Sequence, residues 1–365
     1  RFNNFCDKIE NSLKKTKYQY IISDVFCGKS CSCLICQNCK HMSNRFEDFY
    51  NLTMEVKNIN NLKDSLQKMN VPEIIDDFKC SNCNEKVTIN KILFFSKLPN
   101  VLVVHLKRFY LDYETFNTKK INSRFEFPRT LNLKQFCGEE ITKNFENSGS
   151  DDDPEIYKKE DSYYEYVLKG INVHIGSADG GHYFSFIDVN RDGKNNLLNE
   201  NTKENKENWL IFNDSKVSVF DTDSIPNECY GGCKEGYSYE NVQNGYLLIY
   251  ERKKKAPIRV LIDEKDIDKE KEKDKIINFN KDNKSQIEKE YDLSRINTDK
   301  KEKDLYDKIF FDEDKNEYFK YIPFYNIPKY APKEIYNEIM KENNNSPSID
   351  SSNNKNLANY KRYKG

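Results

Sequence analysis

Apolar residues recur at every fourth position near the start of the chain. Within residues 4–17, Phe5, Ile9 and Leu13 follow this spacing, which places them on one face of a helix. Residues 62–69 repeat the pattern over a shorter stretch. We therefore expect an amphipathic helix at each of these two places.

Two apolar runs follow at residues 92–95 and 101–109, and the turn-forming pair Pro99 and Asn100 lies between them. This order predicts a strand, a turn and a second strand. Later in the chain, four runs rich in aromatic and β-branched residues predict further strands. These runs span residues 163–175, 182–189, 209–212 and 245–250. Because strands so close in sequence usually pair with their neighbours, we expect an antiparallel sheet.

Polar segments interrupt this pattern and suggest the domain boundaries. Residues 139–162 are acidic and residues 190–208 are rich in Asn, Lys and Glu, so both are expected to be surface insertions. We expect residues 1–252 to form the folded domain. Residues 253–305 are dense in charge and are expected to form a linker or an exposed helix, and residues 306–365 a small C-terminal segment with a partly disordered tail.

Charge and hydropathy exclude some classes of partner. Of the 365 residues, 59 are Lys or Arg and 60 are Asp or Glu, so the net charge is −1. Because electrostatic binding of nucleic acid needs a basic excess, we expect no nucleic-acid partner. No apolar run approaches the roughly 18 residues of a membrane span, and no signal peptide follows Arg1. We expect no membrane partner, a cytoplasmic or nuclear location, and a chain that starts inside a longer polypeptide.

The cysteines are arranged as metal ligands. Five of the 11 cysteines lie within residues 27–39, which in a chain without secretory features points to metal rather than to disulfides. Cys36 and Cys39 form one CxxC pair, and Cys80 and Cys83 form a second pair after 40 intervening residues. Two such pairs supply the four thiolates of a tetrahedral Zn²⁺ site. Because four protein ligands leave no position for water, we expect the zinc to be structural.

The register of the first pair stays open. Cys33 and Cys36 also have CxxC spacing, and His41 is close enough in sequence to serve as a ligand. We prefer Cys36 with Cys39 because the residues between them, Gln37 and Asn38, are polar and turn-prone, as they are in the second pair.

A histidine later in the chain is a candidate base. Gly180 and Gly181 immediately precede His182, which opens an apolar run. A histidine at the head of a strand and next to a glycine loop can meet a substrate while the sheet holds its ring. The next expected strand ends at Asn213 and Asp214, which are able to orient an imidazole. This signal is weak alone, but the order of His and Asn is that of papain-type cysteine proteases.

Taken together, these features resemble the ubiquitin-specific proteases, a family of ubiquitin carboxyl-terminal hydrolases, over residues 2–252. Besides the two CxxC pairs, the matching segments are residues 97–99 (Lys-Leu-Pro), 106–109 (Leu-Lys-Arg-Phe), 127–128 (Phe-Pro), 166–183, 209–217 and 245–251. Residues 227–232, with the sequence Asn-Glu-Cys-Tyr-Gly-Gly, look most like the fat facets subgroup.

The resemblance implies an α+β fold of the papain-like cysteine protease type, with an antiparallel palm sheet and zinc-ribbon fingers at about residues 26–90. It implies a deubiquitinase that hydrolyses the isopeptide bond after the C-terminal Gly-Gly of ubiquitin. Its partners would be ubiquitin and ubiquitinated proteins.

The resemblance also assigns roles to single residues. His182 takes the position of the general base, Asn213 that of the third member and Asp214 that of its supporting neighbour. His174 belongs to the same segment but is not the catalytic histidine. The implied substrate-binding residues are Gly180, Gly181 and Tyr183, because a channel lined by glycine suits a tail that ends in two glycines.

The chain departs from the family in one respect. Members place the nucleophilic Cys in an upstream segment that also supplies oxyanion-hole donors, and no such segment occurs here. We therefore expect the thumb lobe to be missing and this chain alone to be inactive. Cys6 lies in the wrong context to be the nucleophile. Two alternatives are a non-catalytic ubiquitin-binding scaffold and a zinc-ribbon interaction module unrelated to ubiquitin.

Overall fold

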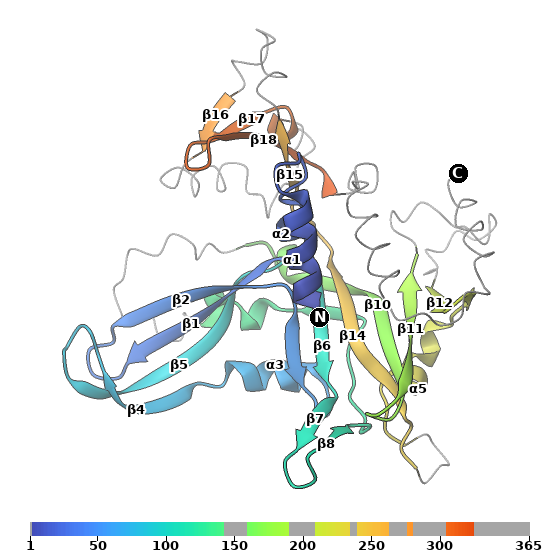
Figure 1. The fold of residues 1–365 in the computed structure, drawn as a ribbon. Coiled ribbons are helices and arrows are strands. Elements are labelled where there is room, and N and C mark those ends of the chain that lie inside the picture. Colours follow the sequence, from blue (N-terminus) through green and yellow to red (C-terminus); the bar gives the residue numbers. More distant parts are fainter. Residues whose placement is uncertain are drawn as a thin grey trace.

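The computed structural model describes residues 2–141, 159–189, 209–233, 239–262, 276–279 and 304–324. In this part, the chain forms three sheets, a separate hairpin and several short helices, and most neighbouring strands are antiparallel (Figure 1). The α+β class and the antiparallel palm sheet expected from the sequence are confirmed. The helices of the described part are all too short or too polar to cross a membrane.

The first sheet, which we call the finger sheet, has the strand order β2–β1–β5–β4 and is antiparallel throughout. It projects to the left in Figure 1, away from the other sheets. Its strands are β1 (Gly28–Cys36), β2 (Met42–Phe49), β4 (Glu73–Lys79) and β5 (Lys86–Lys97). The short helix expected at residues 62–69 is confirmed as α3 (Leu62–Asn70), and the Asn61 side chain caps it by accepting a hydrogen bond from the Asp64 backbone N–H.

The second sheet, the palm sheet, has the order β13–β12–β11–β10–β14–β6–β3, with β9 paired to β10. Only its β3–β6 pair is parallel among the described strands. Its strands are β3 (Leu52–Glu55), β6 (Val101–Lys107), β9 (Thr130–Asn132), β10 (Glu165–Gly176), β11 (Gly181–Asp188), β12 (Trp209–Asn213), β13 (Lys216–Val219) and β14 (Gln243–Arg252). The four strands expected in an antiparallel sheet are therefore confirmed, although the first begins two residues late because Tyr163 and Tyr164 lie in a 3₁₀ turn.

A buried corner joins the finger and palm sheets. The expected strand–turn–strand over residues 92–109 is present as β5 and β6, but the two strands belong to different sheets. Asn100 at the turn is buried, and its amide nitrogen donates to the carbonyls of Asp24 and Ala256. Its amide oxygen accepts from the Arg252 guanidinium and the Ala256 N–H. All hydrogen-bonding groups of this buried side chain are used, and they tie the turn to residues 24, 252 and 256.

Two helices open the chain. The helix expected at residues 4–17 is confirmed as α1 (Phe2–Leu13), but it ends at Leu13 because Lys15 has a positive φ of 64°. A second helix, α2 (Ile21–Phe26), was not expected. Both helices bury apolar side chains against a strand from much later in the chain, with Ile9 and Ile258 each 1% exposed.

That strand corrects the expectation for residues 253–305. Instead of a linker or an exposed helix, the described part of this segment contributes β15 (Ile258–Ile262) and β16 (Ile276–Phe279) to a third sheet of order β15–β18–β17–β16. Its other strands are β17 (Ile309–Asp312) and β18 (Glu317–Ile322). The third sheet lies above α1 and α2 in Figure 1. The pattern was misleading because Arg259, which adds to the apparent polarity, pairs with Asp24 of α2 in a nearly buried contact.

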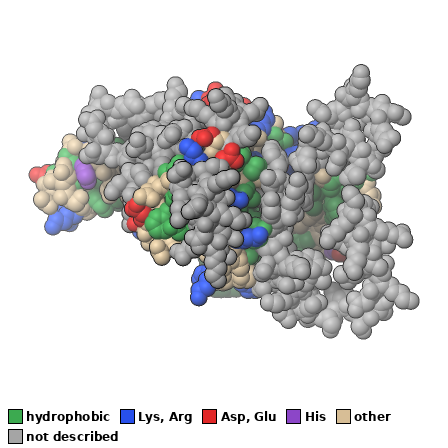
Figure 2. Space-filling view, turned by 90° about the horizontal axis from the view of Figure 1, so that it is seen from above, with side chains coloured by type: hydrophobic (Ala, Val, Ile, Leu, Met, Phe, Trp, Pro, Cys, Tyr) green, Lys and Arg blue, Asp and Glu red, His purple; other side chains and the backbone are tan. Residues whose placement is uncertain are grey.

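The remaining elements are short. β7 (Phe109–Asp112) and β8 (Asn117–Lys120) form a hairpin at the bottom of Figure 1, and the helices α4 (Gly138–Ile141) and α5 (Ile225–Cys229) flank the sheets. On the face shown in Figure 2, the described charged side chains of both signs are scattered among apolar ones. The two expected insertions fall largely, and the expected tail wholly, outside the described residues.

Candidate functional site

The palm sheet brings His182 and Asn213 together. β11 and β12 are antiparallel neighbours, so the start of β11 and the end of β12 lie side by side at the same end of the strands. His182 is the second residue of β11 and Asn213 is the last residue of β12. The distance from His182 Nε2 to Asn213 Oδ1 is 2.6 Å. Residues 31 positions apart thus form a direct hydrogen bond.

This contact determines the state of the imidazole. An amide oxygen only accepts hydrogen bonds, so Nε2 carries the proton and the lone pair of the neutral ring is at Nδ1. The Phe184 ring stacks near the imidazole, with 6.3 Å between centroids and 20° between planes. The His182 side chain is 43% exposed. The pair therefore presents a basic nitrogen on an accessible edge of the sheet.

Asp214 supports the same ring nitrogen more weakly. It lies in the two-residue turn between β12 and β13 with a φ of 50°, a conformation that Asp tolerates better than most residues. Its Oδ2 atom is 3.7 Å from His182 Nε2, and its side chain is 79% exposed. A solvated carboxylate at this distance stabilises an imidazolium only slightly.

The two glycines before His182 differ in their surroundings. A Cβ atom on Gly181 would lie 2.3 Å from His174 Nε2 and 2.5 Å from the Ile175 carbonyl, so a side chain does not fit there. A Cβ atom on Gly180 would have no atom within 4 Å. Packing against His174 requires glycine at position 181, whereas there is free space next to position 180.

His174 is a packed residue in this structure. Its side chain is buried, and its Nδ1 atom has no hydrogen-bond partner among the described residues. Burial, and then the nearby Lys120 charge, lower the pKa of His174. The rings of Phe109 and Tyr183 lie 5.2 and 4.7 Å from it, and Tyr183 is itself partly exposed. A buried neutral imidazole of this kind fits a structural role.

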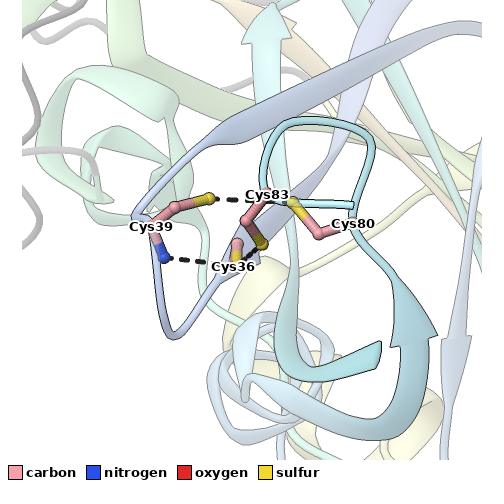
Figure 3. Close-up of side chains that lie close together, drawn as sticks. All are labelled: Cys36, Cys39, Cys80 and Cys83. Carbon is pink, nitrogen blue, oxygen red and sulfur yellow. Dashed lines mark hydrogen bonds between the residues drawn. The ribbon is translucent and has the colours of Figure 1, made fainter. Parts of the chain in front are cut away.

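The fingers gather four thiols. The sulfur atoms of Cys36, Cys39, Cys80 and Cys83 all lie within 4.8 Å of one another (Figure 3). The sulfurs of Cys36 and Cys83 are 4.0 Å apart, and those of Cys39 and Cys80 are 3.7 Å apart. Zinc at about 2.3 Å from each of four tetrahedral sulfurs would separate them by about 3.8 Å. The cluster has the dimensions of a zinc site.

Two turns of the same shape produce this cluster. The first connects β1 to β2, and in it the Cys36 N–H donates to the His41 carbonyl while the Lys40 N–H donates to the Cys36 carbonyl. The second connects β4 to β5 and repeats both bonds, from Cys80 to Glu85 and from Asn84 to Cys80. The fourth residue after each first cysteine has a positive φ, 60° at Lys40 and 57° at Asn84. The two turns therefore have the same knuckle conformation.

The thiol chemistry suits a cation. Hydrogen bonds from the Asn82 side chain and then from the His41 backbone lower the pKa of Cys39 to about 6. Backbone N–H groups of Cys83 and Asn82 lower the pKa of Cys80, whereas burial raises the pKa of Cys83 to about 12. N–H groups aimed at sulfur stabilise thiolates, and four thiolates this close repel one another unless a cation lies between them.

The clustering of the thiols favours one of the two registers of the first pair. Along β1, Cys31, Cys33 and Ile35 alternate into one apolar cluster, whereas Cys36 joins Cys80 in another. Because side chains alternate across a strand, residues 33 and 36 face opposite sides of the sheet. His41 is exposed and is not among the four clustered residues. The preferred set is the one that the fold brings together.

No thiol accompanies His182 among the contacts of the described residues. Cys6 is on α1, buried with the apolar residues of the first two helices. Burial, followed by the charges of Glu10 and Asp7, raises the pKa of Cys6 to about 12. Such a thiol is a poor nucleophile near neutral pH.

Two cationic residues hold several backbone carbonyls that the sequence did not connect to them. Arg108 is fully buried, and its guanidinium donates to the carbonyls of Gly245, Ile121, Ser123 and Tyr230. The Lys120 ammonium donates to three other carbonyls at the ends of β10 and β14. Most of these acceptors are more than 50 residues away in sequence, so no local pattern reveals them.

Comparison with known proteins places these features in a family context. A family model described as ubiquitin carboxyl-terminal hydrolase matches residues 2–250. Human ubiquitin carboxyl-terminal hydrolase 34 is 29% identical over 266 residues, which cover 69% of this chain and 7% of that protein. The mouse 9Y hydrolase is 31% identical over 275 residues, covering 69% and 10%. The FAF protein of Drosophila melanogaster is 30% identical over 282 residues, covering 71% and 10%.

The chain therefore spans a tenth or less of the length of these relatives. Among solved structures, the SAGA Ubp8/Sgf11/Sus1/Sgf73 DUB module bound to ubiquitin aldehyde contains a chain that is 27% identical to this one. The TM-score is 0.46, and the match covers 65% of this chain and 43% of that chain. The resemblance found in the sequence, including the likeness to the fat facets subgroup, is confirmed by the family and its curated members.

Proposed function

The chain belongs to the ubiquitin carboxyl-terminal hydrolase family, and from this premise we propose that it forms the finger and palm parts of a cysteine-type deubiquitinase. The reaction would be hydrolysis of the isopeptide bond after the C-terminal Gly-Gly of ubiquitin, with ubiquitinated proteins as substrates. The observation that carries the proposal is the His182–Asn213 pair, which presents Nδ1 at an accessible edge beside the open position of Gly180.

In the proposed mechanism, Nδ1 of His182 removes the proton from a cysteine thiol, and the thiolate attacks the carbonyl carbon of the last glycine of ubiquitin. The imidazolium then gives this proton to the lysine amine as the isopeptide C–N bond breaks. Nδ1 next takes a proton from water as the water oxygen attacks the thioester carbonyl. The C–S bond then breaks, the imidazolium returns its proton to the leaving thiolate, and the released carboxylic acid ionises to the ubiquitin carboxylate. Acid and base steps of this kind contribute about 10²- to 10⁴-fold to the rate.

Asn213 has a positional part in this cycle. Its Oδ1 atom accepts from Nε2–H in both the neutral and the protonated ring, so the contact keeps Nδ1 as the reacting nitrogen throughout. Asp214 adds a weak charge interaction with the imidazolium from the adjacent turn.

We infer that the nucleophile and its oxyanion-hole donors come from a part of the protein outside these 365 residues. In support, the contacts recorded for His182 in the described structure include no thiol, and Cys6 is buried in a different cluster. On this reading, the 365-residue chain alone does not turn over substrate.

The ubiquitin tail would pass Gly180 and Tyr183. Gly180 has no neighbour within 4 Å of an added Cβ, and Tyr183 is 46% exposed on the strand that carries His182. Gly181 contributes indirectly, because it lets the His174 ring pack beneath the turn.

Structural Zn²⁺ would be held by Cys36, Cys39, Cys80 and Cys83. Their spacing and the lowered pKa values of Cys39 and Cys80 support this assignment. The metal would cross-link the β1–β2 and β4–β5 turns and stabilise the end of the finger sheet. It takes part in no step of the hydrolysis.

A non-catalytic ubiquitin-binding scaffold is the second candidate, favoured by the same absence of a thiol among the recorded contacts of His182. Hydrolysis of isopeptide-linked diubiquitin by a longer form of the protein, compared with its His182→Ala variant, separates the two. Cleavage that depends on His182 supports the deubiquitinase. Ubiquitin binding by the 365-residue chain without cleavage by the longer form supports the scaffold.

A further inference from the structure

Lys120, the last residue of β8, reaches across to the end of the palm sheet. Its Nζ atom donates to the carbonyls of His174 and Gly176, each at 3.1 Å, and to the Val242 carbonyl at 2.5 Å. The first two carbonyls lie at the C-terminal end of β10, and the third belongs to the residue immediately before β14. One side chain therefore joins the ends of three strands.

The carbonyls of His174, Gly176 and Val242, which we call the cradle, require an ammonium group between them. Three carbonyl oxygens converge on one point, and their partial negative charges would repel one another without a cation between them. An ammonium has three N–H donors in a tetrahedral arrangement, which matches three acceptors. A guanidinium is planar and directs its donors apart, so arginine does not reproduce the cradle. Burial, and then the nearby Arg108 charge, lower the pKa of Lys120 to about 8, whereas the hydrogen bonds to the three carbonyls favour the charged ammonium.

The cradle lies directly behind His182. In the β10–β11 ladder, His182 pairs with Ile175, the residue between the two β10 carbonyls that Lys120 binds. The Gly176 N–H also donates to the Val242 carbonyl, so the same acceptor closes the end of β10 against β14. The lysine thus holds the part of β10 that pairs with His182 of β11.

We propose that Lys120 is a positioning residue for His182. By holding the ends of β10 and β14 together, the ammonium fixes the turn at residues 177–180 and the first residues of β11. This fixes the imidazole at its hydrogen-bonding distance from Asn213. The structural part of this inference is independent of the proposed function, and its catalytic consequence rests on that function.

The four histidines of the chain provide a direct readout. NMR of ring-labelled histidine in the whole 365-residue chain reports the tautomer of each imidazole. The variant Lys120→Met keeps the length of the side chain and removes its charge and donors. Lys119→Met is the matched control, because Lys119 is its neighbour in β8 but pairs with Asp112 of the same hairpin. His41 and His105 serve as internal references.

In Lys120→Met we expect the His182 ring to lose its fixed Nε2–H tautomer and to show the averaged signals of a free imidazole, while the signals of His41 and His105 stay unchanged. Lys119→Met should leave all four histidines unchanged. An unaltered His182 tautomer in folded Lys120→Met overturns the proposal. If Lys120→Met does not fold, Lys120→Arg decides, since it keeps the charge but should still release His182; an unaltered tautomer there overturns the proposal equally.

The catalytic arm uses a longer form of the protein that hydrolyses ubiquitin conjugates. Misplacement of the base should lower kcat on the order of 10-fold to 10²-fold in Lys120→Met with KM nearly unchanged, and Lys119→Met should behave as wild type. A change confined to KM, with kcat unaltered, contradicts the positioning role. Should the wild-type protein not hydrolyse ubiquitin conjugates, the proposed function fails while the NMR result still tests Lys120.

Discussion

The thiol cluster in the fingers and the histidine site in the palm differ in how far their side chains are enclosed. The thiol cluster is closed: four sulfurs from two matching turns face one another within 4.8 Å. The histidine site is open: one ring nitrogen is held by Asn213, and the side chain is 43% exposed. The first site gathers four sulfurs of the described chain, whereas the contacts of His182 in the described chain include no thiol.

Because of this difference, the two sites are expected to have different roles. A closed tetrahedral set leaves a metal no free position and therefore stabilises the fold. An open imidazole with a fixed tautomer contributes little to stability but is ready to move a proton. Substitutions in the fingers should therefore change the stability of the protein, and substitutions at His182 should change its activity.

The largest effect is expected from loss of the thiol pair. The double substitution Cys80→Ser and Cys83→Ser should remove the bound zinc and with it stabilisation on the order of 10 kcal/mol in the finger sheet. Elemental analysis and thermal unfolding measure the two consequences. Cys33→Ser is the control and should retain the metal, because Cys33 faces the other side of β1. Unchanged zinc content in the double variant would contradict the assignment.

A large effect on activity is expected from His182→Ala in a longer, active form of the protein. The value of kcat/KM should fall by at least about 10²- to 10⁴-fold, since the proton-transferring group is lost. The Kd for ubiquitin and the melting temperature should change little, because the imidazole lies at an exposed edge. A variant that loses stability rather than turnover would erase the contrast between the two sites.

The two glycines before His182 sharpen the comparison within the palm. Gly181→Ala should destabilise the protein by about 1–3 kcal/mol, because the new methyl group overlaps the His174 ring and the Ile175 carbonyl. Gly180→Ala has space for the methyl group and should leave the melting temperature unchanged while weakening binding of the ubiquitin tail. Equal thermal stability of the two variants would show that the turn is packed differently.

The smallest effects are expected at the groups that orient the ring. Asn213→Ala should lower kcat/KM by about 10-fold, the worth of one hydrogen bond to a group that becomes charged. Asp214→Ala should lower it by less than about 5-fold, because its carboxylate is solvated. The double variant should exceed either single one. A larger loss from Asp214→Ala than from Asn213→Ala would transfer the orienting role to Asp214.

Local patterns in the sequence predicted much of both sites. The CxxC spacing specified two knuckles because each depends on a few consecutive residues, and the glycine pair before His182 marked the turn at the head of a strand. The sequence did not decide between Cys33 and Cys39, since that choice depends on which face of β1 each side chain occupies.

Long-range contacts were beyond the sequence patterns. The third sheet was mistaken for a linker because Ile258 and Val260 form only a short apolar alternation, and their buried surroundings come from α1 and α2 near the other end of the chain. The Lys120 cradle is equally hidden, since its acceptors lie 54 to 122 residues away. In both cases the charged residue, Arg259 or Lys120, looked like a solvated one.

We propose that His182 serves a cysteine outside these 365 residues. Reaction of a longer form of the protein with ubiquitin bearing a C-terminal electrophile tests it most directly, because the nucleophile becomes covalently attached to ubiquitin and mass spectrometry locates it. We expect an adduct on a cysteine outside residues 1–365 that forms far more slowly in His182→Ala. No adduct, or an adduct on Cys6 or another of the 11 cysteines of this chain, would contradict it.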